Sequence, residues 1–173
     1  AFSSALKPIE RGSTLVSSID LTTTLVSIKS AGEEATITAV VKSAGNVGVA
    51  NQEVVFTSSS GTLLAPSAQT DASGIATVRL SAGSDRSNRT IVVTAVSGSI
   101  TRTLNVAVVG TTLTVTGSTA LQLGGSAATY TVRALDSSSN PIVGAVLTAT
   151  STLGNVLTPS SLTSNVNGNA SFT

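Results

Sequence analysis

The acidic residues are the side chains of this sequence that could bind a metal ion or transfer a proton. Seven of them follow the first 18 residues: Asp20, Glu33, Glu34, Glu53, Asp71, Asp85 and Asp136. Calcium loops draw oxygen ligands from alternating positions, and no run of alternating acids occurs here. Paired carboxylates for glycoside hydrolysis need a pocket, commonly with aromatic platforms, and aromatic residues make up only 2% of the chain. We therefore interpret these acids as turn residues and solvated charges, and we predict neither a metal nor a cofactor.

Other catalytic chemistries are excluded by composition. The 173 residues include no His and no Cys, so the chain itself cannot supply a Ser-His-Asp triad, a Cys nucleophile, a zinc-finger site or a disulfide. The net charge is only +1, which gives no electrostatic footprint for nucleic acid or an anionic membrane. No apolar run is long enough for a transmembrane helix. We therefore predict a protein that is not an enzyme, has no nucleic-acid partner and has no transmembrane segment in this chain.

The densest cluster of charge lies in the segment Ser84–Arg89, between two predicted strands. Binding residues are concentrated on loops that a rigid scaffold holds in place. We therefore single out Arg86, Asn88 and Arg89 as a candidate ligand-binding loop, and Ser137–Asn140 as a second loop that could serve the same role. The alternative is an exposed hairpin tip that is kept polar for solubility.

The elements that must position these residues are predicted to be strands. Apolar and polar residues alternate in 35–41, 53–57, 75–80 and 101–106, and 90–96 is more continuously apolar. Gly, Asn and Ser clusters separate these runs, a pattern typical of β-sandwiches and barrels. Hydrophobic residues make up 40% of the chain, and they are small aliphatics that suit thin β-sheet cores. We predict an all-β fold with almost no helix.

The segment Thr70–Gly74 has the residue types of a tight turn. In the segment Thr70–Gly74, Asp71 can accept backbone N–H groups and Gly74 can adopt a positive φ. We therefore assign Thr70, Asp71 and Gly74 to a structural turn.

The sequence also repeats itself. The segment 48–56 parallels 141–149, 93 residues later, and Gly61 and Pro66 have counterparts at the same spacing in Gly154 and Pro159. Landmarks that recur at one offset indicate a tandem array of β-domains. We predict an N-terminal arm or linker over 1–18, a first domain over 19–109 and a second over 110–173.

The second repeat has no counterpart of two strands of the first, 90–96 and 100–109. A sandwich without them would expose apolar side chains and unpaired strand edges. We therefore expect the second sandwich to lack its last two strands. This leads us to expect that the chain is a fragment, or that a neighbouring molecule or the N-terminal arm covers the gap.

At the repeated motifs the sequence resembles the bacterial immunoglobulin-like group 1 family, of the invasin/intimin type. The first unit carries the pattern as Val54-Val55-Phe56, Gly61, Thr70–Ala76 and Leu80. It departs at Gly48 and Asn51, where the family favours Pro and Gly. The second unit has Pro141 and Gly144, but Ala149 replaces the aromatic residue and Ser164-Asn165 replaces Thr-Asp.

The resemblance implies tandem immunoglobulin-like β-sandwiches, of the kind that form extended arrays on bacterial surface or secreted proteins. It implies a non-enzymatic spacer that supports adhesion, with neighbouring immunoglobulin-like domains as partners and a stiff junction at 108–111. Two alternatives remain open. One is a module that binds a glycan or a host protein through the loops described above. The other is an accessory domain of a secreted polysaccharide-degrading enzyme.

Overall fold

A computed structural model of the chain describes residues 15–122 and 124–173. The described residues form strands, turns and loops, and no helix occurs among them, which confirms the all-β prediction. The strands are β1 (Ser18–Thr23), β2 (Ser27–Lys29), β3 (Glu34–Lys42), β4 (Glu53–Ser58), β5 (Thr62–Leu64), β6 (Ser67–Gln69), β7 (Ile75–Ser81), β8 (Arg89–Ser97), β9 (Ile100–Val109), β10 (Thr112–Thr116), β11 (Tyr130–Leu135), β12 (Val146–Thr148), β13 (Ser161–Thr163) and β14 (Asn169–Phe172).

Strands β1 to β9 form a sandwich, which we call the first group. One sheet has the order β1-β3-β7-β5 and the facing sheet has the order β2-β9-β8-β4-β6. Strand β3 shows the alternation that the sequence predicts, because Ala35, Ile37, Ala39 and Val41 are buried and the residues between them are not. The core is made of small aliphatic side chains around Phe56, its one aromatic residue.

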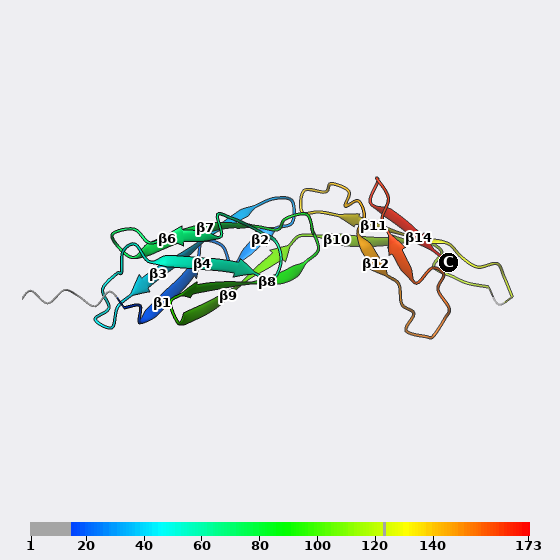
Figure 1. Cartoon of the computed structure of the whole chain (residues 1–173). Coiled ribbons are helices and arrows are strands. Elements are labelled where there is room, and N and C mark those ends of the chain that lie inside the picture. The colour runs from blue at the N-terminus through cyan, green and yellow to red at the C-terminus, as the bar shows by residue number, and fades with distance from the viewer. Residues whose placement is uncertain (1–14, 123) are drawn as a thin grey trace, which may run out of the picture.

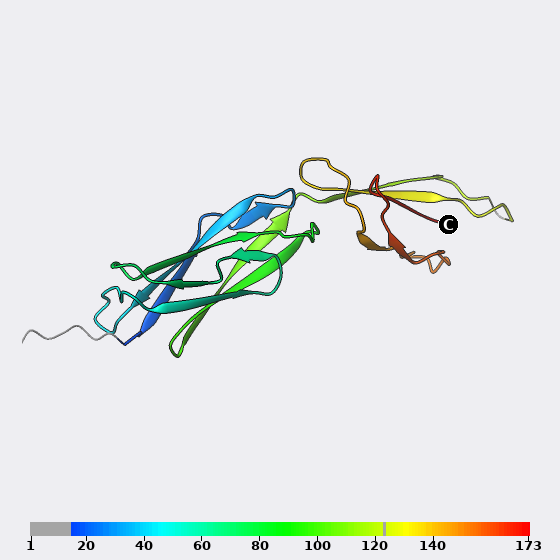
Figure 2. The same cartoon turned by 45° about the horizontal axis from the view of Figure 1, so that its top comes forward.

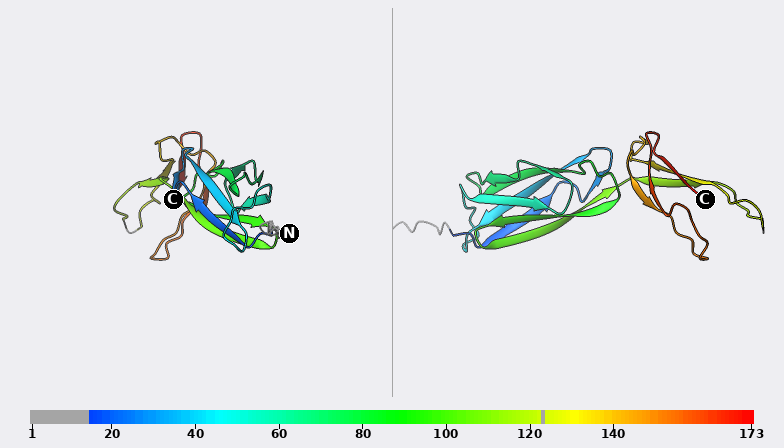
Figure 3. Two further views of the ribbon diagram at one scale, coloured as in Figure 1. Left: turned by 90° about the vertical axis from the view of Figure 1, so that its left-hand side faces the viewer. Right: turned by 45° about the vertical axis from the view of Figure 1, so that its right-hand side comes forward.

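Strands β10 to β14, the second group, follow the first group end to end (Figure 1). Only Gly110 and Thr111 separate β9 from β10. Figures 2 and 3 show the same narrow connection from other directions. Residues 1–14 of the predicted arm lie outside the described residues, and Ser18 already pairs with Lys42 in the first sheet.

The second group reproduces the strand register of the first. Ala39 pairs with Ala76 in the first group, and their counterparts Val132 and Ala170 pair in the second. The bridge from Lys42 to Gly48 recurs between Leu135 and Pro141. The internal repeat therefore has a structural basis, because equivalent residues occupy equivalent ladder positions.

The turn at Thr70–Gly74 also occurs in both groups. The Asp71 carboxylate accepts the N–H groups of Ser73 and Ile75. Gly74 has φ = 80°, and a Cβ there would lie 2.5 Å from the Val41 carbonyl oxygen. The Thr70 hydroxyl donates to the Val49 carbonyl oxygen at 2.6 Å, which ties the turn to the preceding loop.

Its counterpart in the second group uses Ser164, Asn165 and Gly168. The Asn165 side-chain oxygen accepts the N–H groups of Asn167 and Asn169, and the Ser164 hydroxyl donates to the Ile142 carbonyl oxygen. The residues that replace Thr-Asp in the second repeat therefore make the same hydrogen bonds as Thr70 and Asp71.

Candidate functional site

The strongest polar cluster lies where the two groups meet, and Asp136 is its centre. Asp136 follows β11 directly and retains only 4% of its surface exposed. One carboxylate oxygen accepts the backbone N–H groups of Ser138 and Asn140, each at 2.9 Å. The other accepts Nη1 of Arg86 from the first group, also at 2.9 Å. A carboxylate this buried is stable because both of its oxygens accept hydrogen bonds from the chain and one of them is paired with a charge.

Two serine hydroxyls beside this ion pair accept backbone N–H groups from the opposite loop. The N–H of Ser137 donates to the hydroxyl of Ser30, and the N–H of Ala31 donates to the hydroxyl of Ser137, each at 3.0 Å. Ser30 is almost fully buried. Arg86 also donates to the Ser30 carbonyl oxygen at 3.2 Å. The loop after β2, the loop before β8 and the loop after β11 are therefore bonded to one another.

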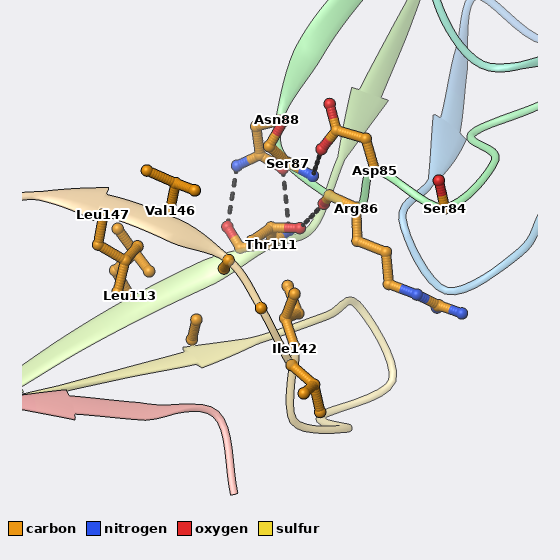
Figure 4. Close-up of a pocket in the computed structure, with 14 residues that line it drawn as sticks. Ser84, Asp85, Arg86, Ser87, Asn88, Thr111, Leu113, Ile142, Val146 and Leu147 are labelled. Atoms are coloured by element: carbon orange, nitrogen blue, oxygen red, sulfur yellow. Dashed lines mark hydrogen bonds between the residues drawn. The ribbon is translucent and has the colours of Figure 1, made fainter. Parts of the chain in front are cut away.

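The connecting residues are fixed as well. Asn88 bonds the backbone of Thr111 twice, accepting its N–H and donating to its carbonyl oxygen, both at 2.9 Å. The Thr111 hydroxyl donates to the Arg86 carbonyl oxygen. Figure 4 shows these bonds, with the Arg86 side chain turned away from the apolar residues nearby. Gly110 has φ = 94°, and a Cβ there would lie 2.5 Å from the Ser137 Cβ.

The candidate loop residues are thus bonded within the chain. Arg86 and Asn88 contact the second group and the connecting segment, as described above. Arg89 stays in the first group, where its guanidinium donates to the carbonyl oxygens of Ala82, Asp85 and Ser87 and to the Ser60 hydroxyl. The second candidate loop, 137–140, lies at the same junction. The structure therefore brings together two loops that the sequence suggested as alternative binding sites.

Asp136 is one of the acids interpreted as turn residues, and it does accept the N–H groups of the turn that follows β11; the sequence did not indicate that it is buried and paired with Arg86. The segment 108–111 has no acid, but folding brings Asp136 to it from the end of β11. No local pattern could reveal this, because Arg86 and Asp136 are 50 positions apart. Two other acids agree with the interpretation as solvated charges: Asp20 pairs with Lys42, Glu34 pairs with Arg79, and both carboxylates are substantially exposed. No group of three acids that could hold a metal ion occurs in residues 15–122 and 124–173.

Electrostatics favours the charged form of Asp136. Burial alone would raise the pKa of its carboxyl group. The hydrogen bonds from Asn140 and Ser138 and the Arg86 charge together outweigh burial and hold the pKa below the ordinary 3.8. The pKa of Asp85 is also lowered, chiefly by its hydrogen bonds from Ser87, with a further contribution from Arg89.

The lowered pKa of Asp136 predicts how the junction responds to acid. A carboxyl group with a depressed folded-state pKa contributes stability above its unfolded-state pKa, and that contribution is lost as the pH falls through the folded-state value. The junction should therefore be fully held at neutral pH and loosen only below pH 3.8. Interdomain NMR residual dipolar couplings measured across this range would detect the change. Asp136→Asn, which cannot ionise, should lose this pH dependence, and an unchanged acid response in that variant would contradict the assignment.

Comparison with solved structures identifies the chain's relatives. A fragment that comprises domains D0 and D1 of intimin is 34% identical to this chain, and the match covers 89% of the chain and 83% of the fragment with a TM-score of 0.46. Identity of this level over most of both sequences decides the family. The chain belongs to the intimin/invasin family of bacterial immunoglobulin-like domains.

Two further solved structures share the fold. The adhesin InvE of Yersinia pseudotuberculosis is 22% identical with a TM-score of 0.59, and the match covers 90% of our chain and 51% of InvE. Invasin, a bacterial integrin-binding protein, is 24% identical with a TM-score of 0.52, and the match covers 90% of our chain and 33% of invasin. The 34% identity to the intimin fragment confirms the family resemblance of the sequence. The chain spans about half of InvE and a third of invasin.

No protein-family model and no curated protein matches the chain. Among residues 15–122 and 124–173, none of the elements is a helix long and apolar enough to cross a membrane.

Proposed function

We propose that this intimin-family chain is a non-enzymatic spacer of a bacterial cell-surface or secreted adhesin. Its domains, 19–109 and 110–173, act as consecutive rigid segments that hold an adhesive or anchoring region at a fixed distance. The junction carries this proposal. Three loops and the two connecting residues are joined by an ion pair and by side-chain hydrogen bonds. A joint of this kind favours transmission of force and orientation over free rotation.

The contacts of the candidate loops favour the spacer over a binding module. Arg86, Asn88 and Arg89 direct their polar groups to partners within the chain, and a ligand would have to displace those partners. Invasin is a bacterial integrin-binding protein. If the complete protein that contains this chain also binds a host partner, we propose that other domains make that contact. The nearest partners of this chain are then the neighbouring domains of its own parent protein.

A distance measurement tests the spacer proposal. Because the chain has no Cys, Ser99→Cys and Thr116→Cys can be spin-labelled uniquely, one at the outer end of β9 and one at the end of β10. At 3.3 Å per residue of strand, their separation should be on the order of 55 Å. Pulsed electron paramagnetic resonance should give one narrow distance distribution.

A control pair of labels within one sandwich shows how broad the distance distribution of a rigid unit is. Ser99→Cys with Thr57→Cys, both in the first group, gives the width expected within one rigid sandwich. An interdomain distribution much broader than this control would contradict the spacer. Binding of the intact chain to host cells or glycans that Arg86→Ala abolishes would favour the binding module instead.

A further inference from the structure

The first and last strands of the first group lie along its length, and the chain enters and leaves the group at opposite ends. Strand β1 begins at the end farthest from the second group, and β9 ends beside β10 (Figure 1). Strand β2 follows β1 after residues 24–26 and pairs with β9 in parallel. Tension that enters before β1 and leaves after β9 therefore pulls β2 and β9 in opposite directions along a shared axis.

The parallel pairing of β2 with β9 decides how such tension is distributed. When two adjacent strands are pulled past each other lengthwise, all the hydrogen bonds between them are strained at once. Antiparallel neighbours joined by a hairpin, such as β8 and β9, have their free ends at the same end of the sheet. Such a pair can be peeled apart one bond at a time. The β2–β9 pair is loaded lengthwise, because the chain leaves its two strands in opposite directions.

Hydrogen bonds close the β2–β9 pair at both of its ends. All of β2 faces the last three residues of β9. At the start of the pair the Ala107 N–H donates to the Val26 carbonyl oxygen at 3.0 Å. At its end the Ser30 N–H donates to the Val109 carbonyl oxygen at 2.9 Å. Strand β2 can therefore slide along β9 only if these bonds and the bonds between them break together.

The side chains of this pair are anchored in the hydrophobic core. Ile28 is fully buried and Val108 is only 1% exposed. Sliding β2 along β9 would pull Ile28 out of the core, and exposing its apolar surface to water costs free energy in addition to the lost hydrogen bonds. Strand β1 adds a second attachment in the other sheet, where it pairs with β3 along its whole length. The first two strands are therefore held by both sheets of the sandwich.

We propose that the paired segments 27–29 and 107–109 form a mechanical clamp, which keeps the first group folded when its parent protein is pulled lengthwise. This role rests on the proposed spacer function, because a spacer that holds an adhesive region away from the cell transmits tension. The clamp is also coupled to the junction. Ser30, whose N–H closes the clamp, accepts the Ser137 N–H with its hydroxyl and the Arg86 guanidinium with its carbonyl oxygen. Tension that crosses the junction therefore reaches both strands of the clamp.

Pulling the chain in two directions tests the clamp. Because the chain has no Cys, DNA handles for optical tweezers can be attached at chosen exposed positions. Ser17→Cys with Val109→Cys loads the clamp lengthwise, and Ser17→Cys with Ser99→Cys pulls two points at the same end of the first group. At equal tension the folded lifetime should be at least about tenfold longer in the first geometry, since lifetimes under force follow the unfolding rate. Equal lifetimes would overturn the proposal.

Two matched core variants locate the resistance. Ile28 on β2 and Ile91 on β8 are both fully buried, so a change of either to Ala should lower the stability to urea. With handles at positions 17 and 109, Ile28→Ala should shorten the lifetime under tension at least about tenfold, because its contacts are lost as β2 slides. Ile91→Ala should stay within about twofold, because β8 keeps its contacts until β2 has left.

The outcomes separate the clamp from the spacer. If both variants shortened the lifetime equally, the whole core would resist the tension and the clamp proposal would be wrong. Handles at positions 17 and 109 leave the junction unloaded, so this result does not depend on how rigidly the two groups are joined. If the lifetimes are as expected but the distance distribution between positions 99 and 116 is broad, the clamp is supported and the spacer proposal fails.

Discussion

Replacing Asp136 with Ala should uncouple the two groups. The change removes the acceptor for the Ser138 and Asn140 N–H groups and leaves Arg86 without its carboxylate partner. Hydrogen bonds to charged groups are worth about 1.5–3 kcal/mol each, and breaking a buried pair by removing one partner is costly. Since Arg86 is partly exposed, we expect a loss of about 2–3 kcal/mol from the stability of the second group. The distance distribution between labels at positions 99 and 116 should broaden.

Two variants separate the possible causes of this effect. Asp20→Ala also removes a carboxylate from an ion pair, with Lys42, but that carboxylate is exposed. It should cost less than about 1 kcal/mol and leave the distance distribution narrow. Asp136→Asn keeps a side-chain oxygen for the turn but not the charge, so its effect should be intermediate. An interdomain distribution in Asp136→Ala that stays as narrow as in the native chain would show that the ion pair does not hold the junction.

Interactions between residues close together in the sequence were predictable, and interactions between distant residues were not. Alternation over a few residues predicted the strands, because the pleat places successive side chains on opposite faces. The turn at Thr70–Gly74 was predictable for the same reason, since Asp71 bonds residues only two and four positions away. The fixed offset of the repeat predicted two similar β-domains, and the structure then showed that β11 and β14 pair in the register of β3 and β7.

The junction was not predictable in this way. Ser30 bonds Ser137 across 107 positions, and neither residue belongs to a motif. Arg86 and Asn88 stood out as charged and polar residues of a loop, and a loop of this kind fits a ligand site and a domain contact equally well. Only the placement of Asp136 beside them distinguishes the two. The internal repeat could not predict this contact either, because the contact joins the two groups and has no equivalent within one of them.

The largest loss of stability should follow from Phe56→Ala. Phe56 lies on β4 with 1% of its surface exposed and is the largest fully buried side chain of the described residues. The remaining core residues are small aliphatics packed around it, and a thin sandwich cannot collapse far to refill the space. Removal of a buried Phe side chain typically costs about 3–5 kcal/mol, from lost transfer free energy and the cavity that remains. Urea denaturation followed by far-ultraviolet circular dichroism should show this shift in the transition of the first group.

The single tyrosine makes the location of this loss measurable. Tyr130 lies in the second group, stacked on Phe172 with ring centroids 5.5 Å apart, so its fluorescence reports the unfolding of that group. In Phe56→Ala the fluorescence transition should stay close to that of the native chain while the dichroism transition moves to lower urea. Val55→Ala, at the neighbouring position on the outer face, should change stability by only about 0.5 kcal/mol. If both transitions moved together in Phe56→Ala, the junction would couple the two groups into one cooperative unit, and Asp136→Ala should then separate them.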